Sequence, residues 1–265
     1  SLPIPKASNL HLVPSPFSPI PILDPVAGLA NIKVEGGIPR LKSNLELAEA
    51  LSERFISKYK DDNVGAYRDF YNETLRLLRS EDLKAFDLAQ VNNATRKLYG
   101  ESKFGQGCLL AKRLVEAGVR FVEVTSDGWD MHKDIKGDMS DIAPSFDQGY
   151  SALIRDLEGS GMLDSTLVVL ATEFGRKPEY TGAGRGHHPA CFTVGLAGAG
   201  VKRGFVLGQS DEQGAAPDVA RTVGDFHATI AHAAGIPREK PFITATGRPF
   251  HVGGTKAEPI LEMFA

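Results

Sequence analysis

The apolar positions at the start of the 43–103 region recur at helical spacing. The stripe consists of Leu47, Leu51 and Phe55. Ser43 precedes this stripe and is followed by Glu46 three residues later. That spacing is the capping-box pattern, so we expect a helix to begin after Ser43. Further helical runs continue to Gly100, a residue typical of helix C-termini, and we interpret residues 43–103 as a helical subdomain.

From Phe104 onward, helical and strand-like runs alternate. Apolar or β-branched runs at 119–125, 165–172 and 191–197 predict three strands. Helical runs lie around and between them, at 104–118, 139–161 and 222–237. This order predicts an α/β domain over residues 104–265, with a mostly parallel sheet and flanking helices.

The first 42 residues have a different character. Half of the sixteen prolines lie between Pro3 and Pro39, in a stretch without helical periodicity. We interpret residues 1–42 as an extended wrapping or linker segment. Because the chain begins at Ser1 without Met, and a domain rarely opens in this way, we expect it to start inside a larger protein. No secretory signal is visible.

Composition excludes some partners. The chain has 265 residues, of which 42% are hydrophobic and 24% charged, as in an ordinary globular protein. A net charge of -3 provides no basic surface for nucleic acid. No apolar run approaches the roughly 20 residues of a membrane span. Cys108 and Cys191 lie in apolar patterns that predict small buried side chains rather than a disulfide.

Chemically active side chains gather at the ends of the predicted strands. In an open α/β sheet, ligands bind beyond the carboxyl ends of the strands. Three loops contribute, with Asp127, Asp130 and His132 in the first, Glu173 and Arg176 in the second, and Arg185, His187 and His188 before the third strand. We therefore expect carboxylates and imidazoles to meet at one edge of the sheet.

Each of these groups also has a simpler interpretation. The pair Asp130 and His132 fits a turn, Glu173 fits a cap, and the pair His187 and His188 fits an exposed loop. The other histidines are not expected to be ligands. His227 and His232 are five positions apart on the last helix and share no face, while His11 and His251 lie in the terminal segments.

Taken together, the residues favour a divalent metal ion beside an anion. Carboxylate oxygen and imidazole nitrogen suit zinc, manganese or iron, with zinc or manganese foremost and calcium a further candidate. Arg176 and Arg185 provide paired donors for a tetrahedral oxyanion. The glycines of this stretch, Gly182, Gly184 and Gly186, allow backbone N–H groups to approach such an anion.

Four stretches carry a resemblance to a known family. They are "GQGCLLAKRLVEAGVRFVEV", "GWDMH", "LDSTLVVLATEFGR" and "GRGHHPACFTVGLAGAGVKRG". They resemble a bacterial family known as domain of unknown function 1501, which is distantly similar to the alkaline phosphatase and sulfatase superfamily. The resemblance runs from about residue 20 to the C-terminus and is densest between Phe104 and Gly204. It implies a partial sulfatase-like α/β fold and an exported, periplasmic hydrolase of small-molecule or glycan esters.

The resemblance also implies a site. Asp130 and His132 match the first pair of metal ligands, Glu173 falls where the second-strand acid belongs, and His188 matches a later histidine. Arg176, Arg185 and His187 would then bind the oxyanion. Phe174 stands where superfamily phosphatases have a second ligand. The family usually has "GRDHWP", and we take His187 to replace its Asp. The superfamily's nucleophile has no counterpart in this chain, so the catalytic nucleophile is not identified.

Two classes of function fit these observations. The first is a metal-dependent phosphatase-like or sulfatase-like hydrolase. The second is a non-catalytic relative that serves as a binding or scaffold module, with the helical block and the Pro-rich start as interaction surfaces. Other enzyme chemistry is a third alternative. The sequence determines neither the substrate, the metal nor the oligomeric state.

Overall fold

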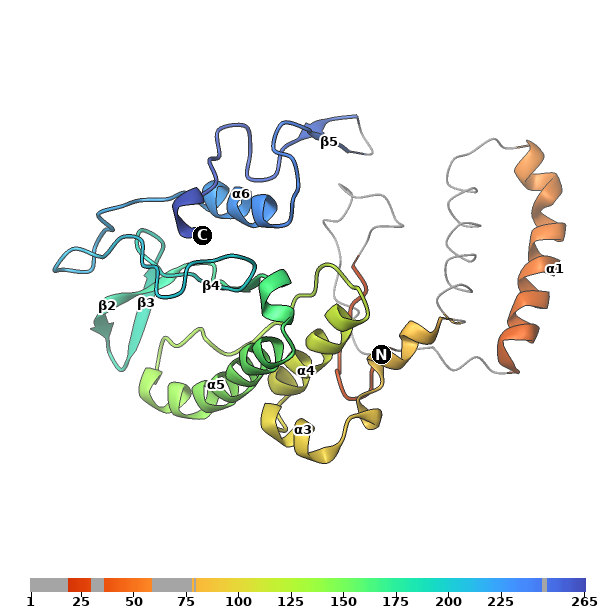
Figure 1. Cartoon of the computed structure of the whole chain (residues 1–265), viewed down its shortest axis with the longest axis horizontal. Coiled ribbons are helices and arrows are strands. Elements are labelled where there is room, and N and C mark those ends of the chain that lie inside the picture. The colour runs from red at the N-terminus through yellow and green to blue at the C-terminus, as the bar shows by residue number, and fades with distance from the viewer. Residues whose placement is uncertain (1–18, 30–35, 59–77, 79, 245–246) are drawn as a thin grey trace. The chain divides into compact units, whose positions relative to one another are not determined.

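The computed structural model describes residues 19–29, 36–58, 78, 80–244 and 247–265 (Figure 1). The chain forms two compact units. The first comprises residues 1–95, 110–123 and 244–246, and the second comprises 96–109, 124–243 and 247–265. The proposed division at residues 42 and 103 stays a prediction. Residues 1–18 and 30–35 of the Pro-rich segment, and residues 59–77 and 79 of the predicted helical subdomain, lie outside the described residues.

The described elements of the first unit are helices. Helix α1 spans Gly37–Lys58, and the short 3-10 helices η3 and η4 span Glu81–Phe86 and Leu88–Gln90. Because α1 begins at Gly37, Ser43 lies inside the helix, and the predicted start after Ser43 is wrong. Pro39 stands in the first turn, where its missing N–H group removes no helical hydrogen bond, so the helix can begin earlier than the capping-box pattern indicates.

Helix α5, Ile135–Gly159, is the longest described helix of the second unit. An aromatic row packs along it: the Phe146 ring stacks on Phe104 at 4.9 Å and receives the edge of Trp129 at 5.4 Å. Gly149 of α5 lies so close to Gly105 that an added Cβ would come within 2.8 Å of the Gly105 Cα. The edge contact with Phe146 holds Trp129, the residue that precedes the predicted ligand Asp130.

The remaining helices follow the sequence prediction in part. Helices α3, Asn93–Tyr99, and α4, Lys103–Glu116, precede α5, and the short η5, Met162–Ser165, follows it. Helix α6 spans Val223–Ala233, and η6 spans Leu261–Met263. Thus α4, α5 and α6 confirm the three helices predicted after Phe104. No helix in the described part of the chain is long and apolar enough to cross a membrane.

The strands form three small antiparallel sheets among the described residues. Strand β1, Val168–Leu170, pairs with β4, Gly195–Ala197; β2, Gly175–Thr181, pairs with β3, Gly184–His188; and β5, Phe242–Ile243, pairs with β6, Pro249–Phe250. The chain is therefore a mixed helix and strand protein, and the prediction of a mostly parallel sheet is wrong. Parallel pairing needs a long crossover, usually a helix. The residues between β1 and β4 instead fold into the hairpin β2–β3, and the chain returns antiparallel.

The predicted strand at 119–125 is not a strand either. Its residues pair with no strand among the described residues, and the side chain of Phe121 is 76% exposed. β-Branched residues favour strands, but composition alone supplies no partner for the backbone hydrogen bonds of the run.

Both cysteines are free. Cys108 is buried, as predicted, and burial raises the pKa of its thiol to about 12. Cys191 is half-buried, so it is less enclosed than its sequence pattern indicates.

Candidate metal-binding site

Two predicted ligands lie on the short loop that leads into α5. The amide of Met131 donates to the carbonyl of Trp129 at 2.9 Å, and the amide of His132 donates to that of Asp130 at 3.1 Å. These are two successive tight turns. The Met131 side chain between them is only 3% exposed, whereas Asp130 and His132 are exposed. The buried methionine therefore anchors the loop while its two polar neighbours face outward.

The loop is held against the hairpin β2–β3. The Arg185 amide donates to the Met131 carbonyl at 3.1 Å, and the Ile135 amide donates to the Ala183 carbonyl at 3.0 Å. Gly184 makes this approach possible, because a Cβ at that position would lie 2.1 Å from the carbonyl carbon and oxygen of His132. A side chain there would push the loop away from β3.

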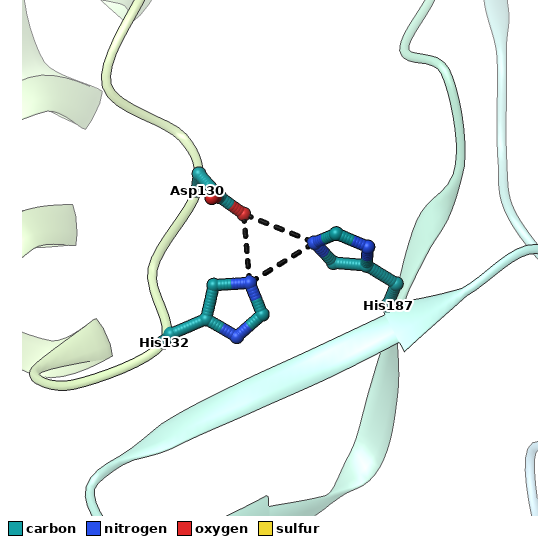
Figure 2. Close-up of side chains that lie close together, drawn as sticks. All are labelled: Asp130, His132 and His187. Atoms are coloured by element: carbon teal, nitrogen blue, oxygen red, sulfur yellow. Dashed lines mark hydrogen bonds and ion pairs between the residues drawn. The ribbon is translucent and has the colours of Figure 1, made fainter.

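Asp130, His132 and His187 converge at the resulting junction. The Oδ1 atom of Asp130 lies 2.9 Å from Nε2 of His132 and 3.1 Å from Nε2 of His187. The two Nε2 atoms are 3.0 Å apart. Figure 2 shows Asp130 and His132 projecting from the loop and His187 from β3 toward a common point. Among the described residues, these three form the one group whose possible ligand atoms lie within 4.8 Å of one another.

A guanidinium lies beside this group. Arg176 of β2 is the cross-strand partner of His187. Its Nη2 donates to Asp130 Oδ1 at 2.6 Å and to the Trp129 carbonyl at 3.2 Å, while Nη1 donates to the Arg185 carbonyl at 3.2 Å. Nη1 also lies 3.4 Å from Nε2 of His132. Four groups thus hold Arg176, and its side chain is only 20% exposed.

These contacts favour the ionised form of Asp130. The hydrogen bond from Arg176, followed by that from His187, lowers the pKa of the Asp130 carboxyl to about 2. The group therefore carries a negative charge throughout the neutral pH range. An ionised carboxylate beside two imidazoles is the donor set that a borderline divalent cation prefers.

The structure brings together only part of the predicted set of metal ligands. That set was Asp130, His132, Glu173 and His188. The first two converge, but Glu173 and His188 do not belong to the group. His187 and His188 are neighbours on β3, so their side chains leave opposite faces of the strand. His188 Nε2 donates to the carbonyl of Gly214 at 2.8 Å instead.

Phe174 and Arg185, two further residues singled out in the sequence, make contacts on or next to the hairpin. The ring centroids of Phe174 and His187 lie 4.2 Å apart, so Phe174 packs against the imidazole of a candidate ligand. Arg185 stacks its guanidinium over Tyr180 at 4.6 Å. The roles of Arg176 and Arg185 in binding an oxyanion stay predictions.

A depression of about 410 Å³ adjoins the cluster. It is lined by Asp130, His132, Lys133, Asp134 and Asp138. Asp134 also caps α5, since its Oδ1 accepts from the Gly137 amide at 3.0 Å. Space for a small ligand therefore lies directly beside the candidate ligands.

One carboxylate and two imidazoles on a solvent-accessible junction are the composition of a mononuclear metal site with open positions. The family described as "Protein of unknown function (DUF1501)" matches residues 14–264, so the chain belongs to that family. A search of curated proteins finds no match. A search of solved structures finds none either.

The motif implied by the resemblance, "GRDHWP", can be compared letter by letter with this part of the chain. When "GRDHWP" is set against residues 184–189 without a shift, Gly186 takes the place of Asp, His187 that of His and His188 that of Trp. The interpretation of His187 as a replacement for the Asp used the wrong register. In the correct register, the motif's histidine is the one that the structure places beside Asp130 and His132.

Proposed function

We propose that this chain is a metal-dependent hydrolase of phosphate or sulfate esters, with Asp130, His132 and His187 as the protein ligands of one divalent cation. The observation that carries this proposal is the convergence of their three ligand atoms within 4.8 Å. Chains of hydrogen-bonded polar groups are common on protein surfaces, but a charged carboxylate with two imidazole nitrogens at one point is a typical zinc or manganese donor set.

The distances within the cluster bear on whether it can hold one metal ion. Ligand atoms about 2.1 Å from an ion are separated by about 3.0 Å when they share one face of an octahedron, and by about 3.4 Å in a tetrahedron. The three separations here are 2.9, 3.0 and 3.1 Å. They are short enough for all three atoms to bind one ion, and both manganese and zinc fit this donor set.

Each protein group has a role in such a reaction. A bound divalent cation would supply Lewis acidity and lower the pKa of a water molecule. Asp130 and the two histidines would hold it through their present positions. Arg176 lies within hydrogen-bonding distance of the same carboxylate and would bind the oxygens of a tetrahedral ester that had reached the cluster. Catalysis would then use water as the attacking group.

The wider assignments rest on resemblance. The resemblance of the sequence motifs to alkaline phosphatases and sulfatases is our reason for proposing a phosphate or sulfate ester, carried by a small molecule or a glycan, as the substrate class. It also supports export to the periplasm. The depression beside the cluster has the volume of a small-molecule site.

Hydrolysis of p-nitrophenyl phosphate and p-nitrophenyl sulfate tests the proposal. The protein is stripped with a chelator and reloaded with Mn²⁺ or Zn²⁺. We expect Asp130→Asn to lower kcat/KM at least about a hundredfold, because the substitution removes the ligand charge. Asp127→Asn is the matched control: this carboxylate lies three residues earlier and outside the cluster, and the variant should retain activity.

The same assay separates the proposal from its main alternative. Hydrolysis that is equal in the Asp130→Asn and Asp127→Asn variants would contradict the proposed site. Tight metal binding without hydrolysis of either ester would favour a non-catalytic metal-binding module instead.

A further inference from the structure

A cationic side chain, Arg176, contacts the cluster directly. Arg176 Nη2 lies 2.6 Å from Asp130 Oδ1, the same oxygen that faces both histidines. A metal ion at the cluster would lie about 2.1 Å from this oxygen. The guanidinium and the ion would therefore share one carboxylate oxygen and lie within about 5 Å of each other.

We infer that Arg176 forms an ion pair with Asp130 in the metal-free protein and binds an oxyanion instead when a divalent cation binds. The divalent cation and the oxyanion would therefore bind cooperatively. This inference rests on the proposed function, since it requires a metal ion at Asp130, His132 and His187. It adds that metal and substrate are coupled through one side chain.

The direction of the effect follows from charge. A unit positive charge and a doubly charged ion within about 5 Å repel each other even when water screens them. This repulsion would weaken the affinity of the site for the metal ion about tenfold or more. Arg176 is only 20% exposed, so screening is incomplete. Removing its charge should therefore strengthen metal binding.

The opposing effect is loss of organisation. Arg176 also binds the carbonyls of Trp129 and Arg185, so its removal loosens the junction to some extent. The loop has other attachments, however: the backbone hydrogen bonds to Ala183 and Arg185, the close approach at Gly184 and the buried Met131 side chain do not involve the guanidinium. Charge repulsion is therefore the larger effect.

An oxyanion changes this balance. Phosphate oxygens accept paired hydrogen bonds from a guanidinium. Their negative charge would replace that of the Asp130 carboxylate as the partner of Arg176. An anion on Arg176 should thus strengthen metal binding, and by linkage the metal should strengthen anion binding by the same factor.

Calorimetric titration of the metal-free chain with Mn²⁺ tests the inference, with and without inorganic phosphate at equal ionic strength. We expect Arg176→Gln to bind Mn²⁺ about tenfold or more tightly than wild type. Phosphate should strengthen Mn²⁺ binding to wild type about fivefold or more, and should not do so in Arg176→Gln. Lys177→Gln is the matched control: it removes the same charge from the next residue, which is exposed, and should behave as wild type.

Two further measurements keep the result interpretable. The melting temperature of each variant in chelator shows whether it is folded. Arg176→Lys retains the charge and should bind Mn²⁺ within about threefold of wild type. If Arg176→Gln does not fold, the effect of phosphate on wild type and Arg176→Lys still decides the matter.

The outcomes are distinct. If wild type binds Mn²⁺ and Arg176→Gln binds it equally or more weakly, the inference is overturned and the proposed function stands. The same holds if phosphate has no effect on wild type or the same effect on Arg176→Gln. If no variant binds Mn²⁺ or Zn²⁺, the proposed function fails, and the inference fails with it.

Discussion

At the scale of single residues, the site depends on which of two neighbouring histidines faces the loop. Strand alternation sends His187 and His188 to opposite faces of β3, and only His187 meets Asp130. The two residues are of the same type, so residue type alone does not distinguish them. The distinction comes from strand geometry and, in the sequence, from the register of the family motif.

The charge state of Asp130 gives a prediction at this scale. Its pKa is lowered to about 2, chiefly by the hydrogen bond from Arg176. We expect the carboxyl pKa in Arg176→Gln to rise toward the ordinary value of about 3.9. Carboxyl ¹³C shifts followed by NMR as a function of pH measure it directly.

The sign of the associated stability effect is fixed. A carboxyl whose pKa is lower in the folded state stabilises the fold above the unfolded pKa of about 3.9, and this contribution disappears as the pH falls toward 2. In Arg176→Gln, stability should therefore depend less on pH between about 4 and 2. A pKa that stays near 2 in this variant would show that Arg176 is not the main cause.

At the scale of elements, the hairpin β2–β3 brings the site together, whereas the sequence pattern predicts a loop at this point. The alternation of the hairpin is hidden by polar side chains on both faces and by an irregular register between Arg176 and Tyr180. Its turn contains Gly182 with φ +67, a conformation that glycine adopts without strain. A glycine between two polar runs was the available sign of a hairpin.

Other elements were predictable because their signals are local. Helices α4, α5 and α6 follow from apolar spacing, and α6 begins with a capping box formed by Thr222 and Asp225. Strand partners depend instead on contacts between residues far apart in the sequence. The apolar runs predicted strands at 119–125, 165–172 and 191–197. They could not indicate that residues 119–125 pair with no described strand, or that β1 and β4 pair antiparallel.

The junction between β3 and the loop gives a prediction at the element scale. Gly184→Ala would place a Cβ 2.1 Å from the His132 backbone, so we expect it to displace the loop and to weaken metal binding at least about tenfold. Unfolding free energy should fall by about 2 kcal/mol or more, as for other overpacked sites. Calorimetry and thermal denaturation measure the two effects.

Gly186 provides the matched control. It lies two residues further along β3, and an added Cβ would meet only Lys177 Cδ at 3.7 Å, which is an ordinary contact. Gly186→Ala should therefore bind metal as wild type does. Equal losses in the two variants, or none in either, would show that the close approach at Gly184 does not position the site.

At the scale of the whole molecule, the candidate site lies entirely within the second compact unit. It is built from the loop before α5 and the hairpin β2–β3, so its geometry does not depend on how the two units are arranged. Family membership extends across both units, because the match covers residues 14–264. The hydrolase assignment is our proposal, and it rests on the cluster of Asp130, His132 and His187.

Metal binding by the two histidine variants tests the central claim most directly. Chelator-treated wild type, His187→Ala and His188→Ala are each titrated with Mn²⁺ and Zn²⁺ by calorimetry, and their melting temperatures are recorded with and without metal. Our account predicts one ion per chain in wild type and His188→Ala, a melting temperature that rises with metal in both, and binding at least about a hundredfold weaker in His187→Ala. Loss of metal in His188→Ala with retention in His187→Ala, or no binding by wild type, would contradict it.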